Sequence, residues 1–71
     1  MTIIRIDKNL GRVELDENGV RKTYHALAGG AVRAYWKNEI RGKDRRQQMS
    51  RDLRPESQRA IEIMNLLTQT E

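Results

Sequence analysis

Basic residues recur between positions 33 and 54 of this 71-residue chain at spacings that suit contact with a polyanion. Arg33, Lys37 and Arg41 follow one another at four-residue intervals, which would place them in one stripe along a helix. The candidate nucleic-acid-binding residues are Arg33, Lys37, Arg41, Lys43, Arg45, Arg46 and Arg51. Cations along one surface meet phosphates and release counterions, so this segment predicts nucleic-acid binding.

The other residue types that carry chemistry do not form a recognisable catalytic set. His25 is the only histidine, neither of the two serines has an evident partner, and there is no cysteine. Glu14, Asp16 and Glu17 form a small acidic group, which we interpret as the solvated side of a strand and its turn rather than a metal site. We therefore expect no catalytic residue, no metal and no cofactor, and a protein that is not an enzyme.

The charge is unevenly distributed along the chain. The 14 Lys and Arg residues against 10 Asp and Glu residues give a net charge of +4. Residues 1–20 carry −1, residues 21–54 carry +7 and residues 55–71 carry −2. A basic middle between two mildly acidic ends attracts a nucleic acid or an acidic protein surface.

Length and composition limit the class of protein. Seventy-one residues support one domain, spanning residues 1–71. The absence of cysteine excludes a disulfide scaffold and a cysteine zinc site, and a secreted protein of this size usually has disulfides. No segment reaches the roughly 20 apolar residues that a membrane span needs, and the N-terminus does not resemble a signal peptide. These features predict a cytoplasmic protein with no membrane contact.

Residues 2–26 are predicted to form a three-stranded antiparallel meander. Residues 2–7 are rich in β-branched side chains, and residues 12–16 alternate between polar and apolar. Asn18-Gly19 between two such runs is the signature of a tight hairpin, because both turn positions need positive φ. Lys22 fits poorly among the apolar residues of its face, which suggests an edge strand or a half-covered face.

The spacing of apolar residues predicts a helix over residues 30–41. Val32, Tyr35, Trp36 and Ile40 follow the i, i+3, i+4, i+8 pattern of one helix face. The stretch from 42 to 54 contains few apolar residues, so we interpret it as a polar, basic linker.

A second helix is predicted over residues 55–69. Pro55 suits its first position, and most of its apolar residues gather on one face. Leu66 lies off that face, which suggests a second contact such as a homodimer through residues 55–69. The expected fold is therefore α+β: a three-stranded antiparallel meander followed by two helices in one small domain.

Two hypotheses about function follow from these observations. The first is a small basic regulatory protein that binds nucleic acid, DNA rather than RNA, through a basic helix and arm between residues 33 and 54. The second is a modulator of the kind found among small phage and mobile-element proteins, which binds and inhibits a host protein complex. In the second hypothesis the basic residues meet an acidic protein surface, and Tyr35 and Leu66 are the interface anchors.

Overall fold

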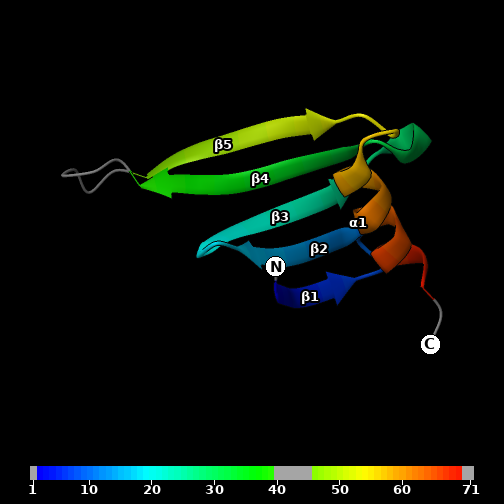
Figure 1. The fold of residues 1–71 in the computed structure, drawn as a ribbon, viewed down its shortest axis with the longest axis horizontal. Coiled ribbons are helices and arrows are strands. Elements are labelled where there is room, and N and C mark those ends of the chain that lie inside the picture. The colour runs from blue at the N-terminus through cyan, green and yellow to red at the C-terminus, as the bar shows by residue number, and fades with distance from the viewer. Residues whose placement is uncertain (1, 40–45, 70–71) are drawn as a thin grey trace.

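The computed structural model describes residues 2–39 and 46–69, which form one antiparallel sheet and one α-helix (Figure 1). The elements are β1 (Thr2–Asp7), β2 (Arg12–Glu17), β3 (Val20–Ala26), the 3-10 turn η1 (Ala28–Gly30), β4 (Val32–Glu39), β5 (Arg46–Leu53) and α1 (Gln58–Thr68). The strand order β1-β2-β3-β4-β5 equals the chain order, so every strand pairs with its neighbours in sequence.

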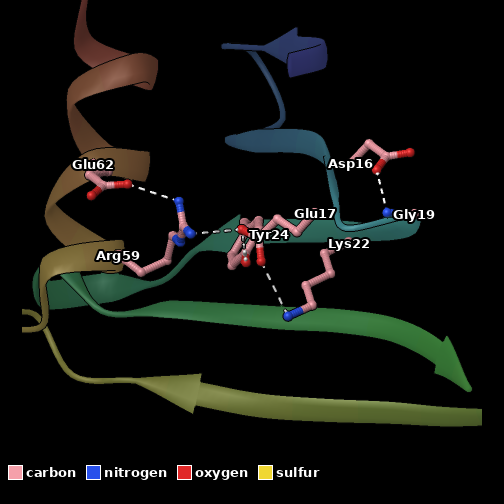
Figure 2. Close-up of polar contacts among 7 residues, drawn as sticks. All are labelled: Asp16, Glu17, Gly19, Lys22, Tyr24, Arg59 and Glu62. Atoms are coloured by element: carbon pink, nitrogen blue, oxygen red, sulfur yellow. Dashed lines mark hydrogen bonds and ion pairs between the residues drawn. The ribbon is translucent and has the colours of Figure 1, made fainter. Parts of the chain in front are cut away.

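The first three strands are joined by turns that the residue types explain. Asn18 and Gly19 have φ values of 53° and 82°, the positive values that a two-residue type I′ hairpin requires. The Asp16 carboxylate accepts a hydrogen bond of 3.0 Å from the Gly19 amide and closes this turn (Figure 2). Gly11, between β1 and β2, also has positive φ.

The prediction of three strands and two helices is wrong, because the described sheet has five strands and the described part of the chain has one α-helix. Residues 32–39 form β4 instead of the helix expected over 30–41. Val32, Ala34 and Trp36 alternate with polar residues, so a period of two was present beside the helical one. Pairing with strands on both sides decided between them, and Val and Trp favour strands.

The expected linker over residues 42–54 is also corrected, since residues 46–53 form β5; its first part, residues 42–45, lies outside the described residues. β5 pairs with β4 along its whole length, from Val32 opposite Leu53 to Glu39 opposite Arg46. A polar strand of this kind suits the edge of a sheet, where only one side of the backbone is hydrogen-bonded and side chains meet water.

The helix α1 begins at Gln58, after the N-cap Ser57. The Ser57 hydroxyl accepts a hydrogen bond from the Ala60 amide at 3.4 Å and donates one to the Arg54 carbonyl at 2.8 Å. Pro55 therefore lies in the preceding turn and not at the first helical position. A serine N-cap satisfies one of the free amides of the first turn.

One face of the sheet, which we call the covered face, carries α1, and the other is the open face. On the covered face Val13 and Leu15 are fully buried against Ile63 of α1. The helix contacts β1, β2 and β3 most closely among the strands. Trp36, on the covered face of β4, is only half-buried, with the Lys22 ammonium 5.3 Å from its ring centre. The misfit of Lys22 thus reflects a face that the helix covers only in part.

Candidate nucleic-acid interface

The hairpin of β4 and β5, which we call the β4–β5 ribbon, extends past the rest of the sheet (Figure 1). The register of β3 with β4 ends where Lys22 lies opposite Trp36. Residues 37–39 therefore pair only with β5. This end of the ribbon is two strands wide and lies away from α1, so the helix covers neither of its faces (Figure 1).

The excess positive charge of the protein lies in this part of the chain. Residues 32–54 hold eight basic and three acidic residues, a net charge of +5. The remaining residues hold six basic and seven acidic residues, a net charge of −1. The charge is therefore uneven along the chain, with residues 32–54 strongly basic and the remaining residues slightly acidic.

The structure distributes the predicted nucleic-acid-binding residues over both faces of the ribbon. Side chains alternate between the two faces along a strand, so Arg33 and Lys37, four residues apart, lie on the same face of β4, the open face. Arg51 lies opposite Ala34 and thus has the register of the covered face. Arg46 belongs to β5, opposite Glu39. The predictions for Arg41, Lys43 and Arg45 fall outside the described residues.

Arg33 forms the best-defined ion pair of the ribbon. Its Nε donates to Asp52 Oδ1 at 2.7 Å, and a second nitrogen donates to Oδ2 at 3.4 Å across the β4–β5 pair. Contacts to the Asp52 carboxylate and the Tyr35 hydroxyl raise the pKa of Arg33, and Arg33 in turn lowers the pKa of Asp52. The pair is exposed, so it orients Arg33 more than it stabilises the fold.

Lys37 and Arg51 differ from Arg33 in having no acidic partner among the residues that the structure describes. Both side chains are exposed. Because no ion pair within residues 2–39 and 46–69 competes for them, these two cations can contact a polyanion directly.

Tyr35 lies between Arg33 and Lys37 on the open face of β4. The sequence interpretation placed Tyr35 on the apolar face of a helix and proposed it, with Leu66, as an anchor for a protein partner. In the structure Tyr35 is half-buried against His25, and Leu66 packs partly against the core of its own chain.

The open face contains residues that the sequence analysis did not propose as binding residues. His25 contacts Tyr35, and Asp52 pairs with Arg33. Ser50 lies opposite Tyr35 in the β4–β5 register. The period-two pattern Arg-Ala-Tyr-Trp-Lys over residues 33–37 could have identified this face, since it sets the two basic residues and Tyr35 on one side.

A separate polar cluster on the covered face holds the helix to the sheet, and Glu17 is its centre (Figure 2). The Glu17 carboxylate accepts a hydrogen bond from the Tyr24 hydroxyl at 3.0 Å and lies 3.3 Å from Lys22 Nζ. Arg59 of α1 reaches the same carboxylate at 3.0 Å and also pairs with Glu62 at 2.8 Å. All charges in this cluster have partners, so we assign it a structural role.

The pKa shifts in this cluster follow from its contacts. Burial raises the pKa of Glu17, but hydrogen bonds from Tyr24 and Lys22 and the charges of Arg59 and Lys22 outweigh it, so the net shift is downward. Burial and the bond to Glu17 raise the pKa of Tyr24 to about 12. The Tyr24 hydroxyl therefore remains protonated at neutral pH and serves as a donor.

Residues 2–39 and 46–69 lack the features of two other kinds of site. This part of the chain contains no group of three or more His, Cys, Asp or Glu side chains placed to hold a metal ion. It also contains no helix with the length and apolar character needed to cross a membrane. Comparison with models of protein families, with curated proteins and with solved structures found no match.

Proposed function

We propose that this chain is a small regulatory protein that binds nucleic acid, DNA rather than RNA, through the β4–β5 ribbon. The observation that supports this proposal best is the charge distribution, with +5 on residues 32–54 and −1 on the rest of the chain. Such a segment neutralises phosphates and releases their counterions, which requires no sequence-specific contact. The helix that the sequence suggested as the DNA-contacting element is replaced by β4.

Lys37 and Arg51, which have no acidic partner among the described residues, have the register of opposite faces of the ribbon. A bound strand that reaches both must therefore pass over the end or edge of the ribbon. The ion pair with Asp52 leaves Arg33 exposed, with 42% of its side chain accessible. In this arrangement Asp52 holds the Arg33 guanidinium in one orientation, and the remaining N–H groups of Arg33 can donate to a phosphate.

Fluorescence anisotropy with a labelled DNA at several salt concentrations tests the proposal. Five to seven phosphate contacts predict a slope of log K against log salt of about −4.5 to −6.3 on duplex DNA and about −3.5 to −4.9 on a single strand. Lys37→Glu and Arg51→Glu, made separately, should weaken binding and make the slope less negative by about one each.

Arg5→Glu is the matched control, since it changes the net charge by the same amount at an exposed strand position distant from the ribbon. The control should bind like the wild type. Absence of binding at low salt, or equal losses in all three variants, would contradict a ribbon interface.

A second candidate function is the inhibition of a host protein complex, and one observation supports it. β1 is an edge strand that pairs only with β2 within the described sheet, and its Ile3 and Ile4 are 45% and 41% exposed. Exposed apolar edge strands are sites where another chain adds a strand. If this function holds, Ile4→Lys should abolish capture of the partner while Lys37→Glu leaves it intact.

A further inference from the structure

The open face of β4 presents an aromatic ring between two cations. Arg33, Tyr35 and Lys37 are alternate residues of one strand, so neighbouring members of the set lie about 7 Å apart along it. Tyr35 is half-buried and thus retains accessible surface. Proteins that bind single-stranded nucleic acid combine a basic path for the backbone with aromatic rings on which bases stack. This stretch of β4 has both components.

A second ring adjoins the first. His25 lies diagonally across the β3–β4 pair from Tyr35, and their ring centres are 5.4 Å apart with planes at 89°. The two rings form a corner in which each fixes the orientation of the other. A planar group that stacks on one ring meets the second at a right angle, so the corner suits one flat ligand ring at a time.

A shallow, largely open hollow of about 390 Å³ lies beside this corner. It is lined by Arg33, Tyr35, Ser50, Arg51 and Asp52. The Asp52 side chain is 64% exposed, so its carboxylate can accept hydrogen bonds from the amino group of a base. The planar guanidinium of Arg33 donates in the same place.

The charge of the open face favours one path across the sheet. On β3 to β5 the open face carries Arg21, Arg33 and Lys37 against Asp52 among the side chains described. On β1 and β2 it carries three acidic residues against two basic ones: Asp7, Glu14 and Asp16 against Arg5 and Arg12. A polyanion is therefore attracted to β3–β5 and not to β1–β2.

We propose that the open face of β3–β5 binds single-stranded DNA, with one unpaired base stacked in the Tyr35–His25 corner and its edge directed to the hollow. Arg33 and Lys37 then contact the phosphates on either side of that base. In a duplex the bases stack on one another and their faces are not available, so the corner selects unpaired strands. This inference rests on the proposed function and specifies the form of DNA that it binds.

The first test uses the wild-type protein and needs no substitution. A single strand of about ten nucleotides is compared, by anisotropy, with an abasic strand of equal length that keeps every phosphate and lacks the central bases. Stacking of one base predicts roughly 5- to 150-fold weaker binding of the abasic strand with an unchanged salt slope. Equal binding of both strands overturns the stacking site and leaves the phosphate interface standing. Binding of a duplex but of neither single strand overturns this inference alone, whereas binding of none of the three at low salt overturns the proposed function as well.

The second test changes the ring itself. Tyr35→Leu keeps an apolar side chain but removes the aromatic face, and should weaken binding of the intact strand by the same factor that the abasic strand shows, with no further loss on the abasic strand. Tyr35→Phe is the matched control, because it keeps the ring and should retain at least most of the affinity. Wild-type affinity of Tyr35→Leu for the intact strand overturns the inference. Should this variant fail to fold, as its Trp36 fluorescence would show, quenching of a fluorescent adenine analogue in the strand by the wild type decides the matter.

Discussion

Replacing Glu17 by glutamine should destabilise the protein by weakening the attachment of α1 to the sheet. The Glu17 side chain is only 15% exposed and receives the Tyr24 hydroxyl, the Lys22 ammonium and the Arg59 guanidinium. Glutamine has nearly the same shape, and its carbonyl can still accept the bond from Tyr24. The substitution removes the charge and also places an amide NH2, which is a donor, where a carboxylate oxygen met Lys22. The experiment therefore measures the loss of the two charged contacts together with this donor–donor mismatch.

The expected loss follows from the value of hydrogen bonds to charged groups, about 1.5–3 kcal/mol each when fully formed. The Lys22 and Arg59 side chains are 29% and 34% exposed and regain part of this energy from water. We therefore expect a decrease in unfolding free energy of about 1–3 kcal/mol, which lowers Tm by roughly 5–20 °C in a domain of this size. Thermal unfolding followed by Trp36 fluorescence at pH 7 measures it.

The effect should depend on pH in a defined direction. The folded-state pKa of Glu17 lies below its ordinary value of 4.5, so its charge stabilises the fold above that value. As pH falls through the folded pKa the contribution disappears, and the Tm values of wild type and Glu17→Gln should converge. Glu62→Gln is the control, because Glu62 is more exposed and its one ion pair within the described part of the chain is with Arg59. A Glu17→Gln Tm within about 2 °C of the wild type at pH 7 would refute this account of the cluster.

Three further substitutions or titrations test the fold. Ile63→Ala should cost about 2–5 kcal/mol because Ile63 is fully buried, whereas Ile61→Ala, at a position 47% exposed on the same helix, should leave Tm nearly unchanged; equal effects would contradict the assigned helix face. Gly19→Ala should lower the free energy of unfolding by about 1–2 kcal/mol, and only because of the φ of 82°, since a Cβ there has no neighbour within 4 Å. A synthetic protein with D-alanine at this position accepts positive φ and should keep the wild-type stability in chemical denaturation. Absorbance titration should show the Tyr24 hydroxyl ionising near pH 12, and this ionisation should be missing in Tyr24→Phe. Because folding raises the pKa of Tyr24, the stability of the fold should fall as pH rises from about 10 to about 12. Ionisation of Tyr24 near pH 10 would contradict its burial.

The first part of the chain was predictable because its strands carry strong local signals. Asn18-Gly19 can form only a narrow set of turns, and the alternation around Val13 and Leu15 fixes which side is buried. The C-terminal helix was predicted from Pro55 and from its apolar face, although it starts later than Pro55 suggested, at Gln58 after the N-cap Ser57.

The middle of the chain was mispredicted because its pattern satisfies two periods at once. Val32 and Trp36 are four residues apart, and that spacing places two residues on one face of a helix and on one face of a strand alike. The two alternatives differ at Tyr35, which joins the apolar face in a helix and the basic face in a strand. Only pairing with β3 and β5 decides between them, and pairing between distant segments is not visible in a local window.

The candidate site shares this limitation. The basic residues were evident from composition, but their partners depend on register: Asp52 meets Arg33 only because β4 and β5 pair from Val32 to Glu39. His25 adjoins Tyr35 for the same reason, through the β3–β4 register. A charge pattern thus predicted a binding segment, whereas its chemical detail required the strand alignment.

The meander order of the sheet has a consequence for how the chain reaches its fold. Each strand pairs with its predecessor, so the sheet can grow hairpin by hairpin with short loops to close. The helix α1 is the exception, since it follows all five strands and returns to β1, β2 and β3. During synthesis the apolar side of the early strands therefore remains exposed to water until α1 has emerged. Docking of the helix is the folding step that joins the residues farthest apart in the sequence.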